Sequence, residues 1–370
     1  MHLTGERPIA GVRLAGRESP WFDGRVKLNK APGHCMKRRA FLQGAGSAAI
    51  SWPMYASAQK DTKAALVAVL SPGSEDLFKL RMAALREGLK DEGMLDGRDY
   101  RIEARFANGD SSQLPQLAQE LIVLKPRVFV AAAHATPAVQ ALRHDIPLVF
   151  TAMAIDPIAV GLAQSYARPG GTATGNVMNA AGGEESLTAK RLGFFRDLVP
   201  GIRRIGMIGV ADYGLIRLES AEEAALRKVA AQLEIRFDSY EIKSTLDDLD
   251  AVLAKALSDG VEAFYISGDP VLTYKMSVVA PRILATGKPA FGPYPDWARA
   301  GLLLAYSSDA IDGFRRAGIY TAKIIRGAKP GDLPIEQASK FWLVINLKTA
   351  RQLGIDAPSN LLMLADEVIE

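Results

Sequence analysis

The strongest constraint on the fold of this chain is the regular alternation of strand-like and helix-like segments. Short apolar runs alternate with longer segments in which apolar residues recur at helical spacing. The first series predicts strands over 64–70, 100–106 and 128–133 and helices over 75–92 and 112–124. After Pro200-Gly201 a second series predicts strands over 204–210, 235–240 and 263–267 and helices over 215–233 and 246–258. Repeated strand-helix-strand units predict parallel sheets, so we expect an α/β protein with two similar Rossmann-like lobes.

The segment 36–58 has the features of an export signal peptide: adjacent arginines, a short weakly apolar stretch and a small-x-small end. Arg38 and Arg39 suit a twin-arginine signal, and cleavage after Ala58 would leave Gln59 as the new N-terminus. A single membrane anchor is the alternative, but the stretch is interrupted by glycine and proline and is shorter than the ~20 apolar residues of a span. Residues 1–35 are predicted to be a disordered leader or to follow a start codon assigned too early. The working protein is therefore predicted to be periplasmic.

The charge of the chain lies mainly in this leader. Residues 1–58 contain nine Lys or Arg and three Asp or Glu, which leaves 36 basic and 38 acidic groups in the remainder, a net charge of −2. A nucleic-acid partner is not expected, because it would need a basic stripe on the folded part. Cys35, the only cysteine, also precedes the cleavage site, so neither a disulfide nor a lipid anchor is implied.

About 310 residues remain after the leader, more than one hydrophobic core usually supports, so two domains are expected. Four predicted strands end beside a proline next to a small or polar residue: Thr136-Pro137, Asp156-Pro157, Asp269-Pro270 and, more loosely, Pro295-Asp296. Such pairs can cap a first helical turn, and ligands of parallel sheets bind at the carboxyl ends of strands. Each pair could instead only start a helix. Their recurrence in both lobes favours a binding cleft where the lobes face each other.

Seven segments resemble the periplasmic substrate-binding proteins of ABC transporters related to the tryptophan-binding type. They are IPLVFTAMAIDP (146–157), ARPGGTATG (167–175), KRL (190–192), VPGIRR (199–204), GAKPGDLP (327–334), FWLVINLKTA (341–350) and ADEVIE (365–370). The resemblance implies the type I periplasmic binding protein fold, in which three hinge strands join two lobes that close on a small organic ligand.

On that fold the chain would leave the first lobe over 174–179, return over 302–307 and cross again over 336–341. The first lobe would comprise 59–176 with 303–335, covered by a helix over 309–326. The second would comprise 177–302 with 336–370, with a helix over 346–353 packed on it.

The candidate loops contain the groups that an amino acid or a comparable small carboxylate needs. These are hydroxyls or helix-start amides for a carboxylate, an acid for an ammonium group, and apolar or aromatic walls. The candidate hydrogen-bond donors are Ser71, Ser74, Thr136 and Thr151. The candidate cation partner is Asp269, with Asp156 and Asp296 in reserve, and the candidate aromatic walls are Tyr213, Tyr294 and Tyr306. The alternatives are that Ser71 and Ser74 only start a helix and that the tyrosines only cover a lobe edge.

No metal or cofactor is expected, since after the leader only His134 and His144 remain and no histidine-carboxylate cluster has metal-ligand spacing. His134 is interpreted as an ordinary loop histidine. Catalysis has no sequence support, because no dinucleotide loop, P-loop or Gly-x-Ser-x-Gly elbow follows a strand. We expect a monomeric binding protein with a small-molecule ligand and an ABC permease as partners. The alternatives are a receptor that presents ligand to a membrane sensor and an α/β enzyme.

Overall fold

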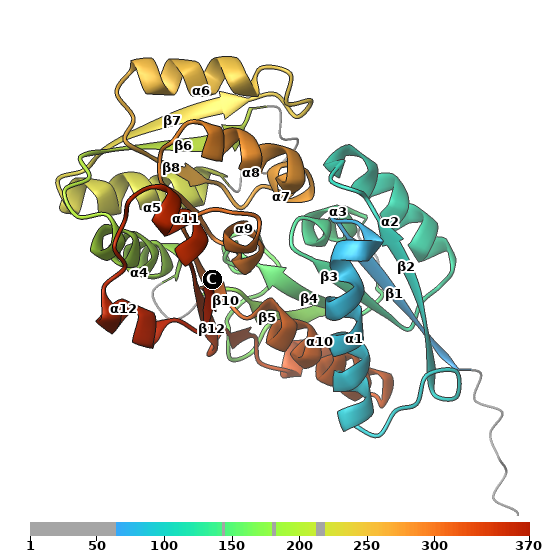
Figure 1. Cartoon of the computed structure of the whole chain (residues 1–370). Helices are drawn as coiled ribbons and strands as arrows, with labels where there is room; N and C mark the ends of the chain where they lie inside the picture. Colours follow the sequence, from blue (N-terminus) through green and yellow to red (C-terminus); the bar gives the residue numbers. More distant parts are fainter. Residues whose placement is uncertain (1–63, 143–144, 180–182, 212–218) are drawn as a thin grey trace, which may run out of the picture. The chain divides into compact units, whose positions relative to one another are not determined.

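The computed structural model describes residues 64–142, 145–179, 183–211 and 219–370, without the side chains of residues 219 and 220 (Figure 1). The predicted leader, the predicted export signal, His144 and Tyr213 lie outside these residues.

The strands of the described residues form two separate sheets. The first has the order β11-β5-β4-β3-β1-β2, and all its strand pairs are parallel. Its strands are β1 (Ala65–Ser71), β2 (Tyr100–Phe106), β3 (Val128–Ala132), β4 (Leu148–Met153), β5 (Ala173–Val177) and β11 (Glu336–Gln337).

The second sheet has the order β13-β12-β10-β9-β8-β6-β7, and within it only the β10–β12 pair is antiparallel among the described strands. Its strands are β6 (Arg204–Val210), β7 (Arg236–Ile242), β8 (Ala263–Ile266), β9 (Ala290–Gly292), β10 (Leu304–Ser308), β12 (Phe341–Asn346) and β13 (Glu367–Ile369). The fold class expected from the sequence, α/β with two mainly parallel sheets, is confirmed.

Helices connect most of the parallel strands. They are α1 (Glu75–Asp91), α2 (Leu114–Val123), α3 (Ala135–Ala141), α4 (Gly183–Leu198), α5 (Glu219–Gln232), α6 (Leu249–Ser258), α7 (Pro270–Tyr274), α8 (Met276–Ala285), α9 (Pro295–Arg299), α10 (Ala310–Ile325), α11 (Leu347–Gln352) and α12 (Ser359–Leu364). Two 3₁₀ turns, η1 (Ser111–Gln113) and η2 (Pro330–Asp332), complete the described elements. The predicted strands over 100–106 and 204–210 match β2 and β6 in full.

Each sheet is covered by helices on both faces, which explains why inner strands such as β1 and β6 are buried along nearly their whole length. The edge strands β2 and β7 instead include charged residues that are exposed or half-buried. In β1, Val67 and Val69 pack into the core that contains residues of α1 and α10, whereas Ala68 and Leu70 pack into the core that contains residues of α2 and α3. The second sheet repeats this arrangement. There Met207 packs into a core with α4 and α5, and the next residue, Ile208, packs into a core with α6 and α8.

Helix α10 lies late in the sequence but packs beside α1 against the first sheet, as expected for 309–326 (Figure 1). Two glycines allow the close approach of these helices. A Cβ atom on Gly88 would lie 1.9 Å from the carbonyl oxygen of Arg315, and one on Gly318 would lie 2.2 Å from that of Leu85. The helix backbones are therefore in direct contact at these positions.

The described strands place three passages of the chain between the two sheets: after β5, after β10 and after β11. Sheet membership differs from the predicted lobe boundaries at two strands. Strand β10 belongs to the second sheet because it pairs with β9 and β12, so the predicted first-lobe segment 303–335 begins a few residues early. Strand β11 belongs to the first sheet because it pairs with β5, so the predicted second-lobe segment 336–370 also begins early.

Within the described residues no helix has the length and hydropathy needed to cross a membrane. The same residues contain no group of three or more His, Cys, Asp or Glu side chains arranged to hold a metal ion.

Candidate functional site

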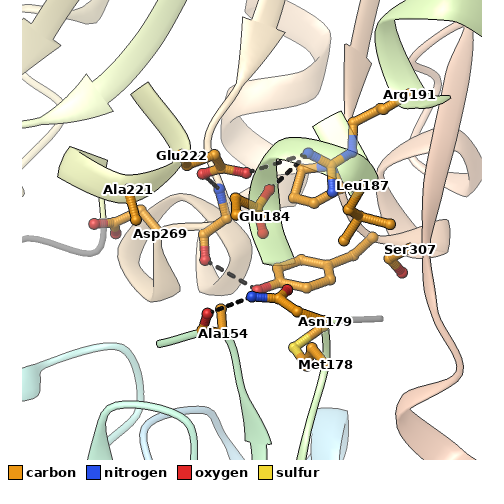
Figure 2. A pocket seen from close by; sticks show the side chains of 13 residues that line it. Ala154, Met178, Asn179, Glu184, Leu187, Arg191, Ala221, Glu222, Asp269 and Ser307 are labelled. Atoms are coloured by element: carbon orange, nitrogen blue, oxygen red, sulfur yellow. Dashed lines mark hydrogen bonds and ion pairs between the residues drawn. The ribbon is translucent and has the colours of Figure 1, made fainter. Parts of the chain in front are cut away.

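A pocket of about 660 Å³ of empty space lies at the carboxyl ends of strands from both sheets (Figure 2). Its lining includes residues that directly follow β4, β5, β8 and β9, together with side chains of α4 and α5. Loops after parallel strands gather at one edge of a sheet, where ligands of such folds bind. We call this the acidic pocket, after its three carboxylates, those of Glu184, Glu222 and Asp269.

A buried arginine anchors this pocket. The side chain of Arg191 is only 1% exposed, and its guanidinium points toward the carboxylates of Glu184 and Glu222 (Figure 2). It lies 3.3 Å from Glu184 Oε1 and 3.8 Å from Glu222 Oε1. It also donates to the carbonyl oxygen of Tyr306 at 3.0 Å and to the Tyr265 hydroxyl at 2.8 Å. Burial opposes the charge of Arg191, but the neighbouring Tyr265, Glu184 and Glu222 outweigh it and raise its pKa, so the side chain stays cationic.

The position of Arg191 follows from the sequence of α4. Leu187, Arg191, Phe195 and Leu198 recur every three or four residues, and all four are buried. An arginine on the apolar face of a helix is carried into the interior, where it needs hydrogen bonds and anionic partners. The two glutamates supply them.

Glu222 is held by its second oxygen as well. The Tyr265 hydroxyl donates to Glu222 Oε1, and the backbone N–H of Gly268 donates to Oε2 at 2.9 Å. Burial and the nearby charge of Glu184 raise the pKa of Glu222, against the opposing effect of Arg191. Since the pocket has three carboxylates and one guanidinium, its chemistry favours a ligand with a cationic group.

Asp269 and Tyr294 come from the loops after β8 and β9. Asp269 is the N-cap of α7 and accepts hydrogen bonds from the backbone N–H groups of Val271 at 2.6 Å and Leu272 at 3.4 Å. The Tyr294 hydroxyl donates to the carbonyl oxygen of Gly268 at 3.3 Å. Burial, with the charge of Glu222, raises the pKa of Tyr294, so its ring forms a neutral wall.

Asn179 lines this pocket from the end of a strand of the first sheet. It follows β5 and donates to the carbonyl oxygen of Ala154, which follows β4, at 2.7 Å (Figure 2). Its side-chain oxygen is buried and has no hydrogen-bond partner among the described residues. Buried polar atoms are usually paired, so this oxygen is available to a donor on a ligand.

A second pocket of about 600 Å³ adjoins the first, because Met178, Gly268 and Tyr294 line both. We call it the apolar pocket, after the side chains of Leu77, Phe78, Tyr274 and Phe314 that line it beside a single arginine, Arg81. Two of its alanines have left-handed backbones: Ala133 after β3 has a φ of 47°, and Ala152, at a bulge in β4, has a φ of 52°. Non-glycine residues in this conformation are uncommon and concentrate at binding sites.

The structure brings two of the ten predicted site residues, Asp269 and Tyr294, to the acidic pocket. Of the predicted helix caps, Asp269 is confirmed. Thr136 does not cap α3, because the helix begins at Ala135 with His134 as its N-cap. The Thr136 hydroxyl instead donates to the carbonyl oxygen of Ala131 at 3.3 Å. Asp156 starts no helix and accepts from the backbone N–H of Ile158 in a turn. Asp296 lies inside α9 and pairs with Arg299 at 3.0 Å.

The other predicted site residues that the structure describes have structural partners. Ser71 accepts from the backbone N–H of Gly73 at 3.1 Å, and Ser74 caps α1. The buried Thr151 hydroxyl donates to Asn176 Oδ1 at 3.1 Å. The ring of Tyr306 packs between Phe194 and Phe341 in the core of the second sheet. Tyr213 lies outside the described residues.

Sequence reasoning missed Glu184, Arg191 and Glu222. Two of them carried a usable signal: Glu184 is in the first turn of the helix that follows β5, and Arg191 interrupts the apolar face of α4. Glu222 gave no such signal, because it lies among the other charged and small residues of α5 and meets Arg191 only through tertiary packing.

Comparisons with known proteins agree with this architecture. A family model described as "ABC transporter substrate binding protein" matches residues 66–369. The chain is similar to a tyrosine-binding protein of Clostridioides difficile (strain R20291), with 24% identity over 278 residues, or 73% of this chain and 75% of the relative.

Two solved structures show the same fold. An ABC domain from Streptococcus pneumonia in complex with L-Trp matches with a TM-score of 0.74 and 22% identity, over 83% of this chain and all of that one. A conserved domain protein from Vibrio cholerae matches with a TM-score of 0.73 and 24% identity over the same shares.

Proposed function

We propose that this chain, which belongs to the family of ABC transporter substrate-binding proteins, is the extracytoplasmic solute-binding component of an ABC importer. Its ligand is a small organic molecule with a cationic amine, and the amine binds in the acidic pocket. The amino acids with an aromatic or branched side chain are the class that suits the site best.

One observation carries this proposal. The acidic pocket has three carboxylates, and Arg191 is the only cation among its described lining residues. Arg191 contacts Glu184, Glu222, the Tyr265 hydroxyl and the Tyr306 carbonyl oxygen. Because it carries a single positive charge, it neutralises only part of the charge of the three carboxylates. A ligand ammonium group is the complementary partner, and the oxygen of Asn179 can accept one of its hydrogen bonds.

The apolar pocket supports the second part of the proposal. Its aromatic and aliphatic side chains adjoin the acidic pocket, so a ligand with its amine at the carboxylates can place an apolar side chain against Phe78 and Phe314. The similar proteins agree with this ligand class, since one is named as tyrosine-binding and one was solved with L-Trp.

For the mechanism we propose ligand-linked closure. The three passages between the sheets act as the hinge, and ligand stabilises the closed form because it contacts residues attached to both sheets. The closed surface is what the permease recognises, and the protein works as a monomer with no catalytic role. Export by the signal over 36–58, by the twin-arginine route, would deliver it to the periplasm.

A thermal-shift screen of the mature protein against amino acids, sugars, purines and organic acids tests the ligand class, because a ligand bound to the folded form raises apparent stability. We expect stabilisation by aromatic or branched amino acids. Stabilisation by sugars alone would remove the amino-acid proposal. X-ray scattering then tests closure, since an unchanged radius of gyration at saturating ligand would contradict hinge motion.

A further inference from the structure

Arg81 is a cation without an anionic partner. It lies on α1 and lines the apolar pocket. Its guanidinium carbon sits 5.1 Å from the centre of the Phe78 ring, but within the described residues Arg81 takes part in no hydrogen bond or ion pair. Burial lowers the pKa of Arg81, against the attraction of Asp296 and Tyr294. A partly buried guanidinium that lacks an anion is unfavourable, and a bound anion would relieve this cost.

The carboxylate of Asp296 does not fill this role. Asp296 attracts Arg81 from a distance, but its carboxylate is within 3.0 Å of Arg299 on its own helix. The contact with Phe78 is a cation–π interaction, which satisfies none of the guanidinium N–H groups.

A second polar group faces the same pocket from the other sheet. Thr273, on α7, lines the apolar pocket, and its hydroxyl oxygen is buried without a hydrogen-bond partner among the described residues. Arg81 and Thr273 thus present donors from elements attached to different sheets. Tyr294 lines both pockets, so the pocket that holds this pair adjoins the acidic pocket at its ring.

We propose that Arg81, with the hydroxyl of Thr273, binds the carboxylate of the ligand. The inference rests on the proposed function and narrows its substrate class: the ligand is amphoteric, with its amine at the acidic pocket and its carboxylate at Arg81. Arg81 is then a determinant of specificity for acids over their neutral amides, and it ties the ligand to α1 of the first sheet.

The test compares L-tryptophan and L-tyrosine with their carboxamides, which keep the ammonium group and lose the carboxylate charge. Titration calorimetry on the mature wild-type protein is expected to show acids binding about 10- to 100-fold more tightly than amides, the usual effect of a hydrogen bond between charged groups. Arg81→Gln is expected to remove this preference, and Arg81→Lys to keep part of it. Thr273→Val is expected to weaken acid binding less than Arg81→Gln does.

Arg86→Gln is the matched control, because Arg86 lies on the same helix, is exposed and pairs with Asp96 outside both pockets. It should keep the full preference. An acid preference that survives in Arg81→Gln, or equal wild-type affinity for acid and amide, overturns the role of Arg81 while the proposed function stands. Wild-type protein that binds no amino acid or amide overturns the proposed function itself. The wild-type comparison needs no variant, so equal affinity for acid and amide overturns the role of Arg81 even if Arg81→Gln does not fold. If Arg81→Gln does not fold, Arg81→Lys supplies the variant arm, and a full acid preference in it counts against a bidentate contact at Arg81.

Discussion

Replacing Arg191 with methionine should destabilise the protein strongly at neutral pH. Methionine fills much of the same space, but the change removes a side chain that is 1% exposed and contacts Glu184, Glu222, Tyr265 and the Tyr306 carbonyl oxygen. Removing one partner of a buried ion pair typically costs about 3–5 kcal/mol, because the remaining charge stays buried without compensation. Here two carboxylates would remain, so we expect a loss in that range for Arg191→Met.

The pH dependence of this loss is a separate signature. The folded-state pKa of Glu222 is already raised above its unfolded value, so the folded state binds more protons and the contribution of Glu222 to stability falls as pH rises through that interval. Without Arg191 the folded-state pKa should rise further. The variant should therefore recover part of its lost stability as pH falls from neutral toward the unfolded-state pKa of a glutamate, about 4.3, and recover more than the wild type does.

Urea unfolding followed by circular dichroism at several pH values measures both effects. Arg196→Met is the control, because Arg196 lies on the same helix and is exposed, and surface changes usually alter stability by less than about 0.5 kcal/mol. Equal unfolding midpoints for Arg191→Met and Arg196→Met would refute the structural role of the ion pair. A pH profile parallel to that of the wild type would refute the account of Glu222.

Three further predictions concern packing, pH and the ligand. Gly318→Ala should lower the free energy of unfolding by about 1–3 kcal/mol in a thermal scan, because its Cβ would meet the Leu85 carbonyl oxygen at 2.2 Å. Gly193→Ala, within α4, is the control and should be neutral or slightly stabilising, since its Cβ would enter open space. Equal values would show that α1 and α10 can separate without cost. Burial lowers the pKa of His134 to about 3, so the stability that its neutral ring supplies is present above about pH 6.5 and lost as pH falls toward 3. His134→Asn should therefore flatten this part of the acid-unfolding profile. An unchanged profile would contradict this role of His134. Asp269→Asn keeps the N-cap of α7 but removes a charge from the acidic pocket. Calorimetry should therefore show about tenfold weaker binding of an amine ligand, with little change in melting temperature. Unchanged affinity would exclude Asp269 from the cation site.

The sequence by itself determined the fold class and much of the element order. The run 204–210 matched β6 because a strand buried on both faces needs almost no polar residue along its length. The run 100–106 matched β2 although three of its residues are charged, because β2 is an edge strand. The cap at Asp269 followed from local chemistry, since a carboxylate followed by a proline favours a helix start. The same pair at Asp156-Pro157 forms only a turn. The same reasoning failed at Thr136, because α3 already begins at Ala135 and the Thr136 hydroxyl donates to the carbonyl oxygen of Ala131 in β3.

Only the tertiary structure decided which polar side chains share a pocket. Glu184 and Glu222 are far apart in sequence and on different helices, and they meet because α4 and α5 pack side by side and enclose Arg191. The unpaired state of Arg81 was equally invisible, since a lysine or arginine on an amphipathic helix is normally solvated or paired with a neighbour on that helix. Local patterns specify secondary structure through interactions a few residues long. A binding site depends on distances between segments that the chain brings together only when both sheets have formed.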